Sequence, residues 1–139
     1  MKLHFEGLEL ECAALGPISS DEPYEDWITC RVRVRVLNFT GSFTWQVMAG
    51  ELASLAADLE AASHRIGEPM VVQFSPAEPN VGLEFAFNDL GQIAGKYRFR
   101  GEGSGFEPEL AGRFVADQTY LPEVVAELRS LLAEARTAV

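Results

Sequence analysis

Residues 27–36, WITCRVRVRV, alternate strictly between apolar and polar side chains, and this pattern constrains the fold more than any other stretch. The apolar parity holds Ile28, Cys30, Val32, Val34 and Val36, and the polar parity holds Thr29, Arg31, Arg33 and Arg35. Because successive side chains of a strand point to opposite faces, the pattern predicts a strand with one buried and one wet face. Such strands are typical of antiparallel sheets, since parallel strands are covered on both faces.

Several other stretches alternate in the same way. Residues 2–12 form one expected strand, whose apolar phase shifts at Glu6-Gly7 and so indicates a β-bulge or a kink. Residues 38–42 are expected to be a turn, after which Phe43, Trp45 and Val47 continue the alternation and complete a hairpin. Four further strand signals are MVVQFS, VGLEFAFN, QIAGKYRFRG and ELAGRFVADQ.

Two stretches have the helical period instead. The first begins at Gly50, and its apolar stripe is Leu52, Leu55, Ala56, Leu59 and Ala62. Gly67 and Pro69 are expected to stop it. The second is the last element, with Thr119 or Leu121 expected as its cap and an apolar stripe of Leu121, Val124, Val125, Leu128, Leu131, Leu132 and Ala135.

The order of these elements predicts an α+β fold. We expect an antiparallel sheet of about seven strands in the order β-β-β-α-β-β-β-β-α, with two helices packed on one face. A chain of 139 residues is expected to form a single domain, residues 1–139, that buries about two thirds of the surface exposed by its unfolded form.

The charge balance opposes some classes of partner. The chain has 21 acidic and 11 basic residues and a net charge of −10, which disfavours nucleic acid and anionic membranes. Its first ten residues lack the basic and apolar regions of a secretory signal, and no apolar run approaches the about 20 residues of a membrane span. We therefore expect a cytoplasmic bacterial protein with no membrane partner.

No motif predicts a catalytic, cofactor or metal site. His4 and His64 have no ligand spacing, and the glycine-rich residues 101–108 fit neither a phosphate loop nor a nucleophile elbow. The acidic loop of residues 16–26 lacks the spacing of a calcium loop. Cys12 and Cys30 share the apolar parity of their strands, which predicts buried reduced thiols, with a cross-strand disulfide as the alternative.

Two basic ladders are the candidate surface features. They consist of Arg31, Arg33 and Arg35 on one strand and Lys96, Arg98 and Arg100 on another. Cations about 7 Å apart repel by only about 0.6 kcal/mol in water, so the ladders do not require a bound anion. Tyr97 and Phe99 have the opposite parity from the second ladder, whereas a nucleic-acid platform has aromatic and basic groups on one face.

We predict instead a charge-compensated outer face. Neighbouring strands carry Glu9, Glu11 and Glu84 on polar parities, and carboxylates are expected within ion-pair distance of at least two of the first three arginines. Three unpaired arginines beside exposed aromatic side chains would favour nucleic-acid binding again.

Spaced residues along the chain resemble those of the WapI-type bacterial immunity proteins and related small bacterial proteins. They are Trp27 before an alternating strand, Gly41 between Phe39 and Phe43, Glu78-Pro79 before a strand, and Leu121-Pro122 at the last helix. The resemblance implies a stoichiometric inhibitor of a cognate protein toxin, and an acidic surface suits a basic toxin because complementary charge speeds encounter. It assigns no functional residue.

The leading hypothesis is therefore a non-catalytic, acidic binding protein, an immunity protein in particular. An alternative is a small enzyme or ligand-binding protein with a cleft between sheet and helices that uses Tyr24, Trp45 and Tyr120. A third is a self-associating module joined through edge strands.

Overall fold

The computed structural model describes residues 1–16, 26–103 and 105–137. In this part of the chain the elements are β1 (Lys2–Phe5), β2 (Leu8–Ala14), β3 (Trp27–Val36), β4 (Phe39–Met48), α1 (Ala49–Ser63), β5 (Met70–Phe74), β6 (Val81–Phe87), β7 (Gln92–Arg100), β8 (Glu109–Asp117), the 3-10 turn η1 (Gln118–Tyr120) and α2 (Leu121–Thr137). The α+β class and the order of strands and helices broadly match the prediction. Most of the predicted acidic loop, residues 17–25, lies outside the described residues.

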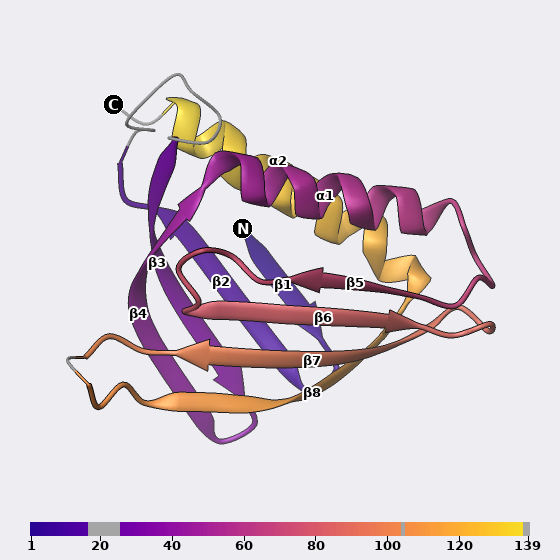
Figure 1. Ribbon diagram of the computed structural model, residues 1–139, viewed down its shortest axis with the longest axis horizontal. Helices are drawn as coiled ribbons and strands as arrows, with labels where there is room; N and C mark the ends of the chain where they lie inside the picture. Colours follow the sequence, from indigo (N-terminus) through magenta and orange to yellow (C-terminus); the bar gives the residue numbers. More distant parts are fainter. Residues whose placement is uncertain (17–25, 104, 138–139) are drawn as a thin grey trace.

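The strands form two sheets, so the single sheet of about seven strands was wrong. Sheet A has the order β1-β2-β3-β4 and sheet B the order β5-β6-β7-β8, and every neighbouring pair is antiparallel (Figure 1). Alternation tells which face of each strand is buried, but it does not tell which strands share a sheet. The helix α1 follows the last strand of sheet A along the chain, and all four strands of sheet B come after it.

The additional strand comes from residues 2–12, where the predicted bulge or kink is a reversal of the chain. Phe5 pairs with Leu8, and Glu6 and Gly7 make the connection, with Gly7 at a φ of 94°. The amide of Glu6 donates to the carbonyl of Val115 at 3.2 Å, and the amide of Val115 donates to the carbonyl of Glu6 at 2.9 Å. This turn therefore joins the edge of sheet A to β8 of sheet B.

The two sheets cross one another, and the helices lie together along one side of them (Figure 1). The helix α1 contacts α2, β4 and β5, whereas α2 contacts β1, β2 and η1. The helices thus touch both sheets and do not cover one face of a single sheet. The predicted apolar stripes of both helices are buried.

The core lies between the inner faces of the sheets and beneath the helices. The ring of Phe114 stacks on Phe5 at a centroid distance of 4.6 Å and meets Phe85 edge-on at 5.5 Å. Phe114 lies directly opposite Gly95, where a side chain would overlap its ring. The absence of a side chain at Gly95 therefore leaves room in the core for the ring of Phe114 on the neighbouring strand.

Helix ends are fixed by side chains from the helices or next to them. Glu51 accepts from the amide of Met48 at 3.1 Å and from the amide of Ala77 at 2.8 Å, so one carboxylate ties the start of α1 to the loop after β5. Asp117 accepts from the amide of Thr119 at 2.8 Å and caps η1, the 3-10 turn that leads directly into α2 at Leu121. The helix α1 ends at Ser63, before Gly67 and Pro69.

Candidate protein-binding surface

The outer face of sheet A carries the first basic ladder. Arg31, Arg33 and Arg35 are exposed, whereas the valines between them are buried. The alternation of the sequence therefore places each side chain on the face that was predicted. We call these three arginines and their surroundings on the outside of sheet A the arginine face.

The predicted ion pairs of this ladder are not formed in the part of the chain that the structure describes. Glu11 lies opposite Arg33 and Glu9 opposite Arg35. Nevertheless, among the residues that the structure describes, no carboxylate oxygen lies within 4.0 Å of the guanidinium nitrogens of the three arginines. Glu9 instead lies 3.4 Å from Nδ1 of His4. An ion pair between exposed side chains contributes at most about 1 kcal/mol of stability. This is too little to fix two long side chains in one geometry.

The neighbours of β3 explain why its arginines lack carboxylate partners. On one side, β4 presents only hydroxyl side chains to them, namely Thr40, Ser42 and Thr44. On the other side, the two glutamates of β2 lie between β3 and the basic side chains of β1, since Lys2 is opposite Glu11 and His4 is opposite Glu9. Each carboxylate is therefore shared between two strands that carry basic groups.

A hollow of about 520 Å³ lies on the arginine face. Its polar lining residues come from all four strands of sheet A and are Lys2, His4, Glu9, Glu11, Arg33, Arg35, Thr40 and Ser42. The hollow thus presents guanidinium, carboxylate and hydroxyl groups together, which is a surface suited to polar contacts with a partner.

The β3–β4 hairpin ends beside the arginine face. Its turn is Leu37–Asn38, so the predicted turn at residues 38–42 was wrong, and residues 40–42 pair within the sheet. Leu37 has a φ of 53° and is 82% exposed, and Phe39 is 66% exposed. A left-handed backbone costs a residue other than glycine about 1–2 kcal/mol. This hairpin tip, residues 37–39, therefore combines backbone strain with two exposed apolar side chains.

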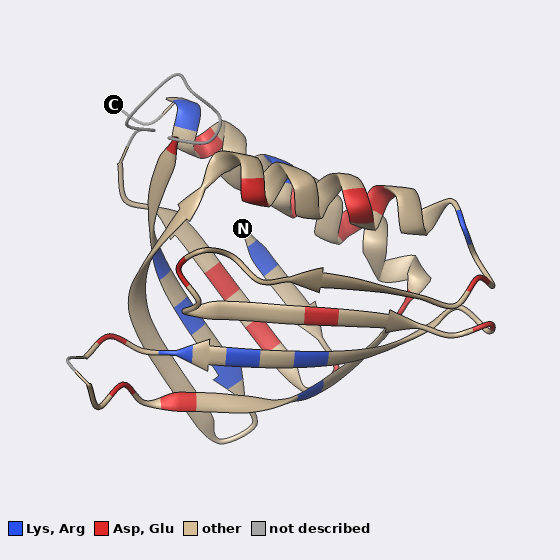
Figure 2. Cartoon of the chain, viewed as in Figure 1, with Lys and Arg blue, Asp and Glu red and all other residues tan. Residues whose placement is uncertain are grey.

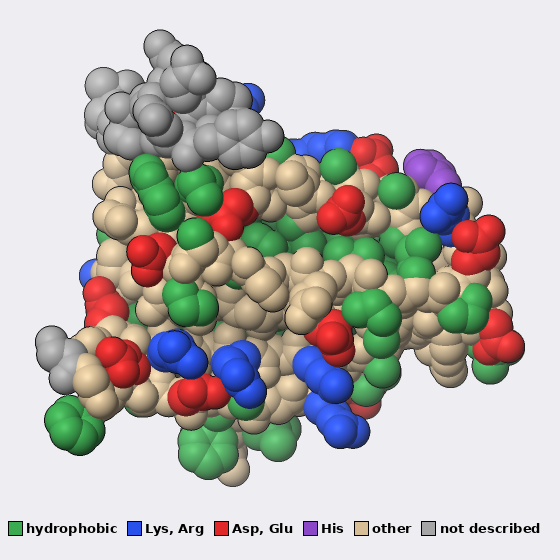
Figure 3. Space-filling view, viewed as in Figure 1, with side chains coloured by type: hydrophobic (Ala, Val, Ile, Leu, Met, Phe, Trp, Pro, Cys, Tyr) green, Lys and Arg blue, Asp and Glu red, His purple; other side chains and the backbone are tan. Residues whose placement is uncertain are grey.

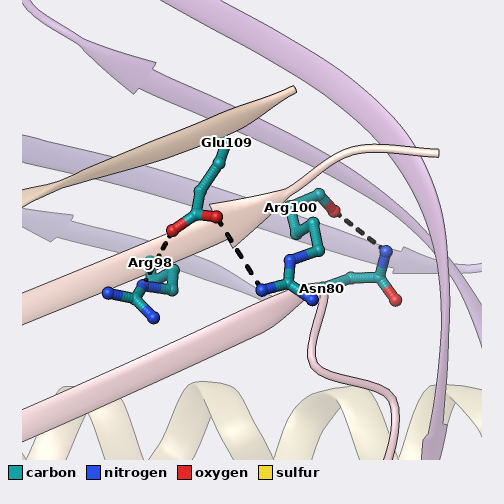
Figure 4. Close-up of polar contacts among 4 residues, drawn as sticks. All are labelled: Asn80, Arg98, Arg100 and Glu109. Atoms are coloured by element: carbon teal, nitrogen blue, oxygen red, sulfur yellow. Dashed lines mark hydrogen bonds and ion pairs between the residues drawn. The ribbon is translucent and has the colours of Figure 1, made fainter. Parts of the chain in front are cut away.

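The second ladder, on the outer face of sheet B, is paired with carboxylates. Lys96 Nζ lies 3.7 Å from Glu84, Arg98 Nε lies 3.0 Å from Glu109, and Arg100 lies 3.8 Å from the same Glu109 (Figure 4). In the space-filling view, basic and acidic side chains are intermixed on this face (Figure 3). The predicted charge-compensated face is therefore present on sheet B.

The aromatic residues of β7 lie beneath its cations, as their parity predicted. Tyr97 and Phe99 are buried and stack on one another at a centroid distance of 5.4 Å. Burial raises the pKa of Tyr97. The side-chain amide of Asn80 donates to the carbonyl of Arg100 at 2.9 Å and holds the end of the strand (Figure 4). The aromatic residues of β7 therefore lie on the opposite face of the strand from its cations.

The residues of the alternative cleft hypothesis do not gather in one place. Trp45 is buried, and its indole nitrogen donates to the carbonyl of Glu78 at 2.9 Å. Tyr120 packs at the other end of the core, with its ring 6.2 Å from that of Phe5. Tyr24 lies outside the described residues. Trp45 is therefore a core residue, and its one polar atom is used in a hydrogen bond within the fold.

The cysteines are free and buried, as predicted. Burial raises the pKa of Cys30 to about 12 and also raises that of Cys12, so both thiols stay protonated. In residues 1–16, 26–103 and 105–137, no three His, Cys, Asp or Glu side chains come together as a metal site. Neither helix of that part of the chain is both long enough and apolar enough to cross a bilayer.

Comparison with known proteins identifies a family over nearly the whole chain. The model of the immunity protein WapI-like family matches residues 2–135. No curated protein matches the sequence. Among solved structures, the chain is similar to the plant transcriptional regulator PBF-2, with a TM-score of 0.47 and 8% identity over 97% of this chain and 81% of that one. A likeness at this level does not bear on function.

Proposed function

The chain belongs to the WapI-like immunity protein family, and on that premise we propose that it binds a cognate protein toxin and so protects the cell that makes it. The observation that carries the proposal is the family match, which extends over residues 2–135. The mode of action is stoichiometric binding, because neutralising a toxin requires only that its active centre be covered.

The charge of the chain supports this function. A net charge of −10 attracts a toxin that is basic overall and so raises the rate of encounter. The helix α1 carries three acidic residues, Glu51, Asp58 and Glu60, and no basic one, and acidic bands lie along the helices (Figure 2). We place the activity in the cytoplasm, where a toxin must be held inactive before export.

We also propose that residues 1–139 act as a single domain. One cluster of buried residues contains side chains from both sheets and both helices, which supports this view. Binding would then not depend on a hinge between separate units.

Co-expression with the product of the adjacent gene tests the proposed function. We expect the neighbouring product alone to stop growth, the pair to restore it, and the two purified proteins to form a 1:1 complex by isothermal titration calorimetry. A toxic neighbour that neither binds the protein nor is neutralised by it would contradict the proposal, as would a neighbour that is harmless.

A further inference from the structure

We propose that the arginine face and the hairpin tip form the surface that contacts the toxin, and that they fit a toxin surface on which carboxylates surround an apolar recess. The inference rests on the proposed function and names the part of the chain that performs it. Three observations carry it: the arginines that have no carboxylate partner among the described residues, the exposed apolar tip and the strained turn.

The first step concerns the pairing of the cations. The outer face of sheet A carries four cations and two carboxylates, and that of sheet B carries four cations and three carboxylates; they are Lys2, Arg31, Arg33, Arg35, Glu9 and Glu11 on sheet A, and Lys96, Arg98, Arg100, Arg113, Glu84, Glu109 and Asp117 on sheet B. Three cations of sheet B have carboxylates within 4.0 Å, but the three arginines of sheet A have none in the described residues. Their guanidinium groups are free to bind carboxylates of a partner, for which the planar fork of arginine is suited.

The second step concerns the apolar side chains beside them. Leu37 and Phe39 are 82% and 66% exposed, and they end a hairpin of two ten-residue strands. Hydrophobic side chains protrude at the lower edge of the space-filling view, where the ribbon view places this hairpin (Figures 1 and 3). The tip follows the strand that carries the arginines, and aromatic residues and arginine are both enriched at protein interfaces.

The third step concerns the backbone of the turn. Leu37 occupies a left-handed conformation that glycine would adopt without strain. A strained residue that exposes a large apolar side chain lowers the stability of the free protein, and such residues cluster at binding sites. The side chain of Leu37 is therefore expected to gain its contacts in the complex.

The observations favour a protein over a nucleic acid as the occupant. Glu9 and Glu11 lie among the cations, where they would repel a continuous phosphate backbone. Phe39 has the parity of the buried Phe43, so it does not stack over the arginine face. A mixed protein surface can instead meet the arginines with carboxylates and the glutamates with basic groups.

The local chemistry is compatible with the acidic character of the chain. The net charge of −10 governs attraction at long range, whereas the groups in contact decide the fit. A toxin that is basic overall and has carboxylates at its active centre satisfies both conditions.

Calorimetric titration with the toxin from the adjacent gene tests the surface. The variants are Arg33→Ala with Arg35→Ala, and Phe39→Ser, and the matched control is Lys96→Ala with Arg98→Ala on sheet B. We expect the sheet A variants to lose at least tenfold in affinity and the control to change less than threefold. Circular dichroism and thermal melting verify that each variant is folded.

The variant Leu37→Gly tests whether the side chain of Leu37 contacts the toxin or whether the backbone strain at this residue has no role in binding. We expect this variant to be more stable than the parent and yet to bind the toxin at least fivefold more weakly. Unchanged affinity in all sheet A variants, with tight binding by the parent, would overturn the surface but leave the proposed function standing. No binding by the parent would overturn both, and arginine-dependent binding of a fluorescent oligonucleotide in place of the toxin would identify a nucleic-acid platform instead.

Discussion

The strands β3 and β7 carry nearly the same pattern, RVRVR at residues 31–35 and KYRFR at residues 96–100, yet their cations end in different surroundings. Both strands bury the apolar residues and expose the basic ones. In β7 every cation of the pattern has a carboxylate within 4.0 Å, whereas in β3 none has one among the described residues. The pattern of one strand thus decides which face a side chain occupies, and its neighbours decide what that side chain meets.

The difference comes from the two strands on either side. The strand β7 lies between β6, which offers Glu84, and β8, which offers Glu109. The strand β3 has glutamates only on the side of β2, and these also face Lys2 and His4 of β1. The ladder of β7 is therefore compensated by neighbouring strands of its own sheet, whereas that of β3 is not compensated by the described residues.

The largest expected difference between the two sheets is in the stability lost when a glycine on the inner face of each is replaced by alanine. Gly95→Ala in sheet B should lower the free energy of unfolding by about 3 kcal/mol, because the new methyl group would displace the ring of Phe114 from its stack on Phe5. The control is Gly41→Ala in sheet A, where the nearest atom would be the Val34 Cγ2 at 3.2 Å and a loss below about 1 kcal/mol is expected. Urea denaturation measures both, and equal losses would show that sheet B is not the more tightly packed of the two.

The next effect concerns the turn between β3 and β4. Leu37→Gly should raise the free energy of unfolding by about 1 kcal/mol, since glycine adopts the left-handed backbone without the penalty of a side chain. Asn38→Gly is the control, because Asn38 does not have a positive φ and glycine there gains nothing. A destabilised Leu37→Gly protein would mean that the leucine makes contacts that stabilise the free fold.

A smaller effect distinguishes the carboxylates of the two outer faces. Glu109→Gln removes the partner of Arg98 and Arg100 and should cost about 0.5 kcal/mol, whereas Glu11→Gln in sheet A should cost less than about 0.3 kcal/mol. In 1 M salt the two variants should become equally stable, because exposed charges are then screened. A larger loss for Glu11→Gln would indicate that the arginine face is compensated in solution.

The smallest effect is a pH dependence of stability that comes from an ion pair between the two helices, outside both basic ladders. Arg129 donates to Glu60, and this hydrogen bond lowers the pKa of Glu60. A carboxyl group whose folded pKa is lowered contributes stability above its unfolded pKa of about 4.3, and this contribution is lost as the pH falls through the folded value. NMR titration of the Glu60 carboxyl should show the lowered pKa, and Arg129→Gln should return it toward its ordinary value.

The sequence predicted the faces of the strands and the stripes of the helices because both follow from periodicity. Two local features were misassigned because glycine has more than one use. Gly7 lies in a reversal of the chain where a bulge or kink was expected, and Gly41 lies inside a strand where a turn was expected. The division into two sheets was not predictable, since it depends on which strands pair and not on the pattern within any one strand.

The candidate site was predictable only in part. Arg31, Arg33 and Arg35 were identified from the sequence, and their exposure followed from parity. Their lack of ion pairs did not follow, because it depends on the register that places hydroxyl groups on one side and shared glutamates on the other. The hairpin was predicted, but its turn was placed at residues 38–42, and the apolar residues Leu37 and Phe39 of the tip were not identified as a surface feature.

Hydrogen exchange of the protein with and without its toxin tests the central claim most directly. The amides of the hairpin tip, residues 37–39, lie in and beside an exposed turn and should exchange rapidly in the free protein. The account predicts that toxin slows exchange at the tip by at least tenfold and leaves the exposed residues 102–103 and 105–107 of the β7–β8 loop unchanged. Protection confined to that loop or to the helices, with the tip unaffected, would contradict it.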